Sequence, residues 1–420
     1  MDNTIIEFLN LKAEEIESVH CSSLKHELIV ELSLLRKPYV CPKCNQNAVK
    51  LKDTYLRKIN HGLFIDRKCI VHYKQKRYKC SLCNHTFNEP CSLVQPHQKK
   101  SIASHLQLME LLKDPHLTFK KVAELLNLSP QTVMDSFYDN LPEHTPVLPR
   151  VLCIDEVYLG RNASKKYVAV LLNFETNEIV DIIYGRTRNA LHSYFQRFPK
   201  EALDNVKYLS SDMYEGFRFL NPHYFKNAKF CTDSFHVIQM INTMFNQQLK
   251  QIMKQVDYGS IEYYLLKQKR FVLLKNSNSI NWYQQEYNHK LGYHVYLMKY
   301  RQLLFDIHPL IKEIYDLKED YLQFNRLKDK DTITRLLEIM ISKFYSHPNK
   351  DVSRVGRTMS KWKQEILNSF TWVNGQRISN GPIESRNNII KLLIRNAAGY
   401  RNFDHLRRRI IYCINHKKRK

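Results

Sequence analysis

Two pairs of cysteines constrain the fold of the first hundred residues more than any other feature of the sequence. Cys41-Pro-Lys-Cys44 and Cys80-Ser-Leu-Cys83 are C-x-x-C sequences, each of which can turn two thiolates toward one point. Four thiolates suit one closed, tetrahedral zinc site, and the 35 residues between the pairs are enough for a hairpin or a small sheet. Such a site leaves no position open for water, so we expect one structural zinc ion without chemistry of its own.

Other interpretations of this region stay open at this point. Cys69, Cys91 and His85 are alternative ligands, and the two pairs are also compatible with buried cysteines that bind nothing. Six of the ten cysteines fall between positions 41 and 91. In a reducing compartment, such clustering indicates metal binding before disulfide formation.

The charge of the chain indicates a polyanionic partner. Lysine and arginine total 65 against 41 acidic residues, a formal net charge of +24 over 420 residues. A basic surface that only keeps a protein in solution is the alternative, but an excess of this size favours DNA or RNA, with binding that weakens as salt rises. No apolar run approaches the ~18 residues that a membrane span needs, and the first residues lack a secretion signal. We therefore expect a soluble, intracellular protein.

Residues 118–138 have the pattern of a helix-turn-helix. Thr118 and Ser129 are favourable N-caps for two short helices separated by a tight turn. The second helix then begins with Gln131 and Thr132, at the position where a recognition helix meets base edges. An ordinary helical hairpin gives the same pattern, but the basic charge and the adjacent cysteine module favour DNA binding.

Two aspartates stand at the ends of predicted strands. Apolar runs predict strands at 150–155, 166–173, 178–184, 206–211 and 228–232, with a helix at 189–198. Asp155 ends the first of these strands and Asp212 follows the fourth. Acids at two strand ends of one sheet can point to one spot, where their oxygens suit magnesium or manganese. Either aspartate alone fits equally well as an acid in a turn.

Glu384 is the candidate for a third acid. The sequence from Asn380 to Pro382 predicts the start of a helix, which places Glu384 in its first turn, where the helix dipole favours the ionised carboxylate. Lys391 and Arg395 follow on the same face at helical spacing. This stripe suits a metal-bound phosphodiester whose backbone is tracked by the helix, and a solvated helix face is the alternative.

The order of these motifs resembles that of the bacterial insertion-sequence transposases of the ISL3 group. In this sequence the motifs are, in order, two C-x-x-C pairs, a helix-turn-helix, and then Ile154-Asp-Glu, Ser211-Asp-Met, Asp233-Ser-Phe-His236 and Ser379-Asn-Gly-Pro-Ile-Glu384. Members of that group are DDE transposases with a ribonuclease-H-like core. The resemblance covers nearly the whole chain.

The resemblance implies roles for residues whose chemistry the pattern alone leaves open. Asp155, Asp212 and Glu384 match the family's three catalytic acids. Asp233 and His236 match a D-x-x-H motif of related transposases. We expect His236 to orient a nucleophile or contact the scissile phosphate, and a core or capping histidine is the alternative.

The resemblance also extends to the C-terminal part of the chain. The stretch 399–403 matches a glycine-tyrosine-arginine sequence of the family. We expect Arg401 and Arg407 to Arg409 to contact phosphates, and a solvated basic tail is the alternative for the arginine run and the terminal lysines. Ser385 and Asn173 depart from the family, which has a small glycine and frequently an aspartate at these places.

The fold class expected from these observations is multidomain α+β. A ribonuclease-H-like α/β catalytic core with a helical insertion follows a small zinc-binding domain and a helix-turn-helix. The predicted segments are 1–95 for zinc binding, 96–145 for the helix-turn-helix, 146–240 for the first part of the core, 241–370 for the helical insertion, and 371–420 for the second part of the core with a basic tail.

The function expected is that of a DNA transposase, located in the bacterial cytoplasm with the nucleoid. Its partners are double-stranded DNA, as element ends and as target, and a second copy of the chain in a homodimer or larger assembly. Two magnesium or manganese ions are expected in the catalytic site, one activating the attacking oxygen and one stabilising the leaving oxygen. The alternatives are a DNA-binding regulator without catalysis, a nuclease that cuts without joining, and a zinc protein that binds RNA.

Overall fold

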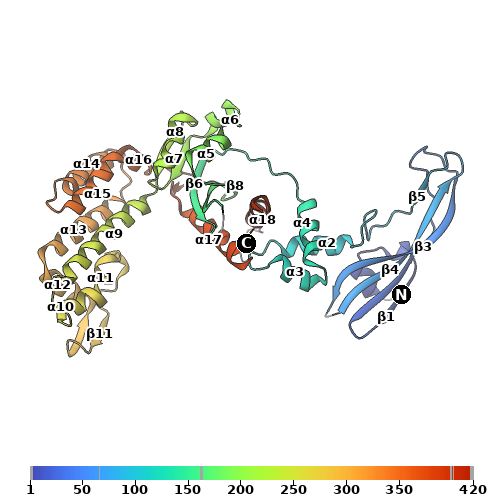
Figure 1. The fold of residues 1–420 in the computed structure, drawn as a ribbon, viewed down its shortest axis with the longest axis horizontal. Coiled ribbons are helices and arrows are strands. Elements are labelled where there is room, and N and C mark those ends of the chain that lie inside the picture. Colours follow the sequence, from blue (N-terminus) through green and yellow to red (C-terminus); the bar gives the residue numbers. More distant parts are fainter. Residues whose placement is uncertain (1–2, 66, 161–163, 398–399, 401, 417–420) are drawn as a thin grey trace. The chain divides into compact units, whose positions relative to one another are not determined.

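The computed structural model describes residues 3–65, 67–160, 164–397, 400 and 402–416 (Figure 1). The chain divides into two compact units, one formed by Met1–Thr145 with Ile389–Lys420 and the other by Pro146–Asn388. The second boundary falls within helix α17 (Gly381–Asn396). The predicted segment 371–420 is therefore shared between the units.

The first unit opens with a five-stranded sheet in the order β1-β2-β4-β3, with β5 paired to β4. Strands β2 and β4 run parallel, and the other neighbours run antiparallel. Apolar side chains of alternate strand positions, Val30 and Val71 among them, form a core with the short helix α1. The elements are α1 (Asn3–Phe8), η1 (Ala13–Glu15), β1 (Ile16–Ser23), β2 (Glu27–Leu34), β3 (Val49–Phe64), β4 (Arg67–Cys80) and β5 (Thr86–Asn88).

Four helices complete the first unit: α2 (Ile102–Leu111), α3 (Phe119–Leu126), α4 (Pro130–Asp139) and α18 (Phe403–Asn415). Their side chains share one small apolar core, to which α18 contributes Tyr412. The ring of Tyr412 meets that of Phe137 on α4 edge to face, with centroids 5.1 Å apart. The last helix of the chain therefore packs against the helix-turn-helix, although 264 residues separate the end of α4 from Phe403 in the sequence.

The second unit is built on a five-stranded sheet in the order β10-β9-β6-β7-β8 (Figure 1). Strands β6, β7 and β8 form antiparallel pairs, whereas β9 and β10 continue the sheet in parallel with β6. The strands are β6 (Val151–Tyr158), β7 (Tyr167–Asn173), β8 (Ile179–Ile183), β9 (Tyr208–Ser211) and β10 (Lys229–Thr232). All five lie where the apolar runs predict strands.

Helices follow the sheet in sequence and share its core. One continuous cluster of buried apolar side chains runs from Ile154 on β6 to Ile366 on α16. The predicted insertion is thus not separated from the strands by a polar layer. Between the strands lie α5 (Arg188–Phe195), α6 (Lys200–Asn205), α7 (Glu215–Arg218) and α8 (Leu220–His223), and after β10 come α9 (Ser234–Met253), α10 (Ile261–Tyr264), η2 (Leu265–Lys269), α11 (Phe271–Leu274), η3 (Ser277–Ser279), α12 (Leu297–Ile307), α13 (Pro309–Phe324), α14 (Lys330–Tyr345), α15 (Lys350–Lys361) and α16 (Lys363–Asn368).

Two small hairpins interrupt this helical region. The first pairs β11 (Gln285–Asn288) with β12 (Tyr293–Tyr296), and the second pairs β13 (Trp372–Val373) with β14 (Gln376–Arg377) just before α17. Over the described residues, no helix is both long and apolar enough to cross a bilayer.

Candidate functional site

The four cysteines of the two C-x-x-C sequences converge at one end of the β3–β4 hairpin. Residues 49–80 form this hairpin, whose register pairs Val49 with Cys80, so the first cysteine pair precedes β3 where the second follows β4. The Sγ atoms of Cys41 and Cys83 lie 3.5 Å apart, those of Cys44 and Cys80 lie 3.7 Å apart, and all four fall within 4.8 Å of one another. A zinc tetrahedron with bonds of about 2.3 Å has S···S edges of about 3.8 Å. The four cysteines therefore fit a metal ion.

The ionisation of these thiols also suits a metal. Burial opposes ionisation of Cys41, but backbone N–H groups of Cys44 and Lys43 and the neighbouring thiols outweigh it and hold the pKa of Cys41 at about 7. For Cys44, the N–H of Gln46 favours the thiolate, yet burial and the other three thiols raise its pKa to about 12. Four thiols this close cannot all be ionised without a compensating cation.

The alternative ligands lie outside this group. Among the described residues, the four cysteines are the one set of three or more metal-ligating side chains whose ligand atoms all lie within 4.8 Å. Cys69 is fully buried in the apolar core of the sheet, and Cys91 packs against the same core beside Tyr73. The backbone carbonyl of His85 accepts from the N–H of Cys80 and supports the second turn.

The helix-turn-helix has the caps that the sequence predicts. Oγ1 of Thr118 accepts from the N–H of Lys121, Oγ of Ser129 accepts from the N–H of Thr132, and Pro130 occupies the first position of α4. Asn127 ends α3 in the left-handed region with φ 50°, which allows the sharp turn. Gln131 and Thr132 are exposed at the start of α4.

One predicted phosphate contact is wrong. Arg409 is 1% exposed, and its guanidinium donates to the backbone carbonyls of Leu112, Asp114 and Leu117, which leaves it inside the first unit. Arg408 donates to the carbonyl of Tyr138 at 2.8 Å and is also turned toward α4. These carbonyls follow or end helices, where backbone acceptors lack partners and a buried cation is well placed to supply donors.

The other predicted phosphate contacts differ in their surroundings. Lys391 and Arg395 are exposed on α17. Arg407 is half-buried and lies 3.7 Å from Asp404. Arg401 and Gly399 of the predicted 399–403 stretch, and the lysine-rich end at 417–420, lie outside the described residues.

Three aspartates stand level on adjacent parallel strands: Asp155 lies within β6, and Asp212 and Asp233 directly follow β9 and β10. The register pairs Cys153 of β6 with Ser210 of β9, and Ser211 of β9 with Thr232 of β10. Two residues beyond Cys153 and Ser210 lie Asp155 and Asp212, and one residue beyond Thr232 lies Asp233. One edge of the sheet thus presents acids side by side, as the sequence predicts for Asp155 and Asp212, but β6 continues to Tyr158 and does not end at Asp155 as predicted.

Helix α17 is fastened to these strand ends at both sides of Glu384. Before it, Oγ of Ser210 donates to Oδ1 of Asn380 at 2.8 Å; after it, Nδ2 of Asn387 donates to Oδ2 of Asp155 at 2.7 Å. Residues 380, 384 and 387 are four and three apart, so they share one face of the helix. Glu384 is exposed between these two contacts.

The three candidate acids are not drawn into one metal-sized group. In the part of the chain that the structure describes, no trio of acids has oxygens within 4.8 Å of one another. Burial raises the pKa of Asp155 to about 6, with the charge of Asp212 adding to the effect and the N–H of Glu156 opposing it. Burial also raises the pKa of Asp212, while His236 lowers it. Mutual repulsion of this kind is relieved when a cation binds.

The oxygen donors at this edge are of the type that a divalent cation takes, although the oxygens of the three acids lie farther apart than in one metal-binding group. Carboxylates and amide carbonyls are the ligands that magnesium and manganese prefer. Besides the acids, Oδ1 of Asn387 is buried and has no hydrogen-bond partner among the described residues, while Nδ2 of the same amide contacts Asp155. Asp155, Asp212 and Glu384 are the residues that would hold the metal.

The two residues of the D-x-x-H motif differ in what they contact. Asp233 is 4% exposed and caps α9, its Oδ1 accepting from the N–H of Phe235 at 3.1 Å. His236, in the first turn of α9, lines a cavity together with Asp212 and acts electrostatically on both Asp155 and Asp212. Asp233 therefore caps the start of α9, and His236 lies in the same cavity as Asp212.

Sequence reasoning misses two residues at this edge. Asn387 was overlooked although it lies one helical turn after Glu384, which is a usable signal. Arg186, in the loop after β8, pairs with Glu156, and its guanidinium lies over the ring of Tyr167 with 4.0 Å to the centroid. Nothing in the sequence around Arg186 indicates this position, because the contact is made across the sheet.

Comparison with known proteins identifies the region that contains these acids. Residues 152–410 match the model of the DDE transposase family of ISL3 type, described as "Transposase". The chain is 20% identical over 263 residues to the transposase for insertion sequence element IS1001 of Bordetella parapertussis, which covers 60% of this chain and 63% of that protein.

A shorter match has a different name. Over 105 residues the chain is 33% identical to a protein of Lactococcus lactis subsp. lactis named ATP-dependent protease, covering 24% of this chain and 30% of that protein. The sequence contains no G-x-x-x-x-G-K-[ST] loop of the kind that cradles nucleotide phosphates. The chain spans less than two thirds of the length of each of these two relatives. The family match covers more than half of the chain and includes all three candidate acids, and the chain belongs to the ISL3 family of DDE transposases.

Proposed function

We propose that the chain is a DNA transposase that binds the inverted repeats at the ends of an insertion sequence, cuts them and joins them to target DNA. The observation that carries this proposal is the level placement of Asp155 and Asp212 on adjacent parallel strands, with the helix of Glu384 fastened beside them through Asn387. A regulator without catalysis is not favoured, because the transposase family match spans the acid-bearing region.

The sheet supports a ribonuclease-H-like core for this chemistry. Three antiparallel strands continue into two parallel strands through helical crossovers, and the acids stand on the central strand and its parallel neighbour. In the proposed division, 1–95 binds zinc, 96–145 is the helix-turn-helix, 146–240 and 371–420 contribute the core, and 241–370 is the insertion.

In the proposed site, Asp155, Asp212 and Glu384 hold two magnesium or manganese ions. Metal ions bound there supply charge neutralisation at the scissile phosphate and at the attacking and leaving oxygens. Asn387 keeps one carboxylate oxygen of Asp155 oriented, and His236 contributes a hydrogen-bonding group beside Asp212. Asp233 holds the start of α9, so that His236 keeps its place.

The proposed DNA contacts come from both units. Gln131 and Thr132 would read base edges, while Lys391, Arg395, Arg401 and Arg407 would contact phosphates. A zinc ion held by Cys41, Cys44, Cys80 and Cys83 would fix the end of the β3–β4 hairpin. The net charge of +24 supports binding to a polyanion and a location with the bacterial nucleoid. Assembly on DNA as a homodimer or larger complex is part of the proposal.

The test uses duplex DNA that carries both flanks of the gene encoding the chain. Purified protein is incubated with this DNA and magnesium, and strand cleavage and joining to a plasmid are followed on denaturing gels. We expect cleavage at the ends of short inverted repeats, and none with Glu384→Gln. Protection of these repeats without cleavage in magnesium or manganese would contradict the enzymatic proposal and leave a DNA-binding regulator. Cleavage without joining would identify a nuclease.

A further inference from the structure

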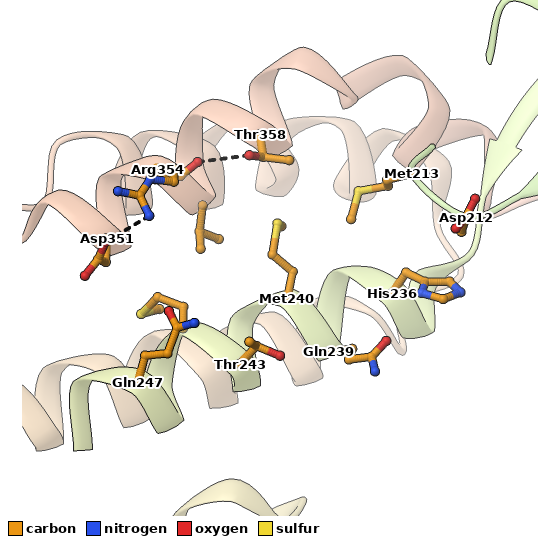
Figure 2. Close-up of a pocket in the computed structure, with 12 residues that line it drawn as sticks. Asp212, Met213, His236, Gln239, Met240, Thr243, Gln247, Asp351, Arg354 and Thr358 are labelled. Atoms are coloured by element: carbon orange, nitrogen blue, oxygen red, sulfur yellow. Dashed lines mark hydrogen bonds and ion pairs between the residues drawn. The ribbon is translucent and has the colours of Figure 1, made fainter. Parts of the chain in front are cut away.

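A groove leads away from the candidate acids into the helical region. It has a volume of about 410 Å³ and begins at Asp212, Met213 and His236. Figure 2 shows that α9 forms one wall and α15 the other, with the side chain of Met240 rising into the gap between them. Any DNA strand whose scissile bond lies at Asp212 must have its neighbouring nucleotides close to the mouth of this groove.

The α9 wall presents uncharged side chains that donate and accept hydrogen bonds. Gln239, Thr243 and Gln247 are all exposed and stand at i, i+4 and i+8, so they form a straight ridge along the helix (Figure 2). Beside the ridge, the thioethers of Met240 and Met244 give the groove an apolar side. Methionine sulfur makes favourable contacts with flat aromatic rings.

The α15 wall is held in place by a network that joins the two helices. Buried Gln248 of α9 donates to Oδ2 of Asp351 at 2.7 Å, and Nδ2 of Asn349 donates to Oε1 of Gln248 at 2.8 Å. Asp351 in turn holds Arg354, with 3.1 Å between Oδ1 and Nη1. These contacts therefore join α9 to α15 at the Asp351 end of the groove.

A second, smaller cavity lies on the other side of the α9 ridge. It has a volume of about 270 Å³ and shares Gln239 and Thr243 with the groove. The Oδ1 atoms of Asn242 and Asn246, which line it, are buried and have no hydrogen-bond partner among the described residues. These two oxygens lie on the same helix as the ridge and are further acceptors for a hydrogen-bonding ligand.

The charge of the groove decides what class of ligand it suits. A track for a phosphate backbone needs several cations, but the lining has one arginine, Arg354, which already pairs with Asp351. Amide and hydroxyl groups beside apolar methionine side chains are complementary to a nucleobase, which has a polar edge and a flat face. The volume is within the range of about 300 to 1,000 Å³ of small-ligand sites and is too small for a duplex segment.

We propose that the groove between α9 and α15 seats one unpaired base of the DNA strand next to the bond that is cut. Gln239, Thr243 and Gln247 contact the polar edge of this base, and Met240 and Met244 contact its face. Taking a base out of the stack disrupts pairing at the element end, and a dedicated seat offsets that cost. This inference rests on the proposed transposase activity.

The test compares the combined variant Gln239→Ala, Thr243→Ala, Gln247→Ala with the wild-type chain on a series of duplexes. Each duplex carries the gene's flanks with a single abasic site at one of the positions around the cut. The matched control is Gln251→Ala, which is on α9 and exposed but outside the groove. All four positions face solvent, so the fold is expected to survive.

On intact DNA, the combined variant should cleave about tenfold or more slowly than wild type, since a seated base contributes that much or more. At one abasic position the difference should shrink to about twofold, because no base is left to seat. A ratio that stays the same at every abasic position, or equal rates on intact DNA, would reject the groove as a base site. If wild-type protein cuts none of these DNAs, the proposed function fails and the inference fails with it.

A second measurement does not depend on cleavage. With calcium in place of magnesium, 2-aminopurine at the sensitive position should brighten when wild-type protein or Gln251→Ala binds, because the base leaves the stack. The combined variant should bind without this brightening. Equal brightening with the combined variant would overturn the proposal.

Discussion

Nδ2 of Asn387 donates a 2.7 Å hydrogen bond to Oδ2 of Asp155, across 232 residues of sequence. This contact joins the helix that carries Glu384 to the strand that carries the first acid. It leaves the second oxygen of the Asp155 carboxylate to the N–H of Glu156 at 2.8 Å. The carboxylate is therefore oriented from two elements before any cation binds.

Removing this contact should affect both stability and cleavage. Asn387→Ala leaves a buried carboxylate without its side-chain donor, which we expect to lower the free energy of unfolding by about 1–3 kcal/mol. Cleavage should fall by about 10–100-fold, as is typical when a partner of a metal ligand is removed. Thermal unfolding and cleavage rates measure the two effects. Glu384→Gln is the matched variant: it is exposed and should abolish cleavage at unchanged stability, and a loss of stability as large as that of Asn387→Ala would contradict this.

Replacing Asp155 should make the metal-free protein more stable. Burial raises the pKa of Asp155 to about 6, so the folded chain carries an unfavourable carboxylate charge above that pH. Asp155→Asn removes this charge and should add roughly 1–3 kcal/mol at pH 7.5 while cleavage is lost. Because the folded pKa is higher than the ordinary value, the gain should be absent below about pH 4, grow between pH 4 and 6, and stay constant above pH 6. A gain that is equally large at pH 4 would show that the charge is not its cause.

The cysteine cluster should account for all of the bound zinc. Cys41→Ser removes one of four ligands, and we expect zinc measured by mass spectrometry to fall from about one ion per chain to near zero. Cys91→Ser tests the alternative ligand and should leave the zinc content unchanged, since Cys91 lies outside the cluster. The opposite pattern of zinc loss would reassign the site.

Arg409 should stabilise the DNA-binding helices without touching DNA. Arg409→Met leaves the carbonyls of Leu112, Asp114 and Leu117 without this donor, and should lower the free energy of unfolding by about 2–4 kcal/mol. DNA binding should weaken as a consequence of unfolding. Arg395→Ala, at an exposed position, should weaken DNA binding at unchanged stability. The slope of the logarithm of the binding constant against the logarithm of salt concentration should become shallower by about one. Equal stability of the two variants, followed by urea unfolding, would refute the structural role of Arg409.

Local features were predictable because short stretches of sequence determine them. The five strands of the second unit are mostly buried and each contains an apolar run, and the caps at Thr118 and Ser129 depend on residues three positions away. The family was also predictable, since the order of short motifs is specific, and the match over 152–410 confirms it. The roles of the acids stay a prediction.

Contacts between distant segments were not predictable in the same way. The run Arg407 to Arg409 reads as a charged surface, yet Arg409 stands between Leu406 and Cys413 on the buried face of α18. Helical spacing offered that signal, but only the backbone carbonyls near α2, about 300 residues earlier, make burial of a cation favourable. The groove beside Asp212 likewise depends on α9 and α15, whose separation in the sequence exceeds the reach of any local pattern.

The packing of α18 against the helix-turn-helix has a consequence for synthesis of the chain on the ribosome. The first 145 residues emerge early, but Tyr412 and Arg409 complete their helical core only after the segment 146–408 has also been translated. A nascent or prematurely terminated polypeptide therefore lacks the complete core of the helix-turn-helix. Only a chain that already contains Asp155, Asp212 and Glu384 completes this core.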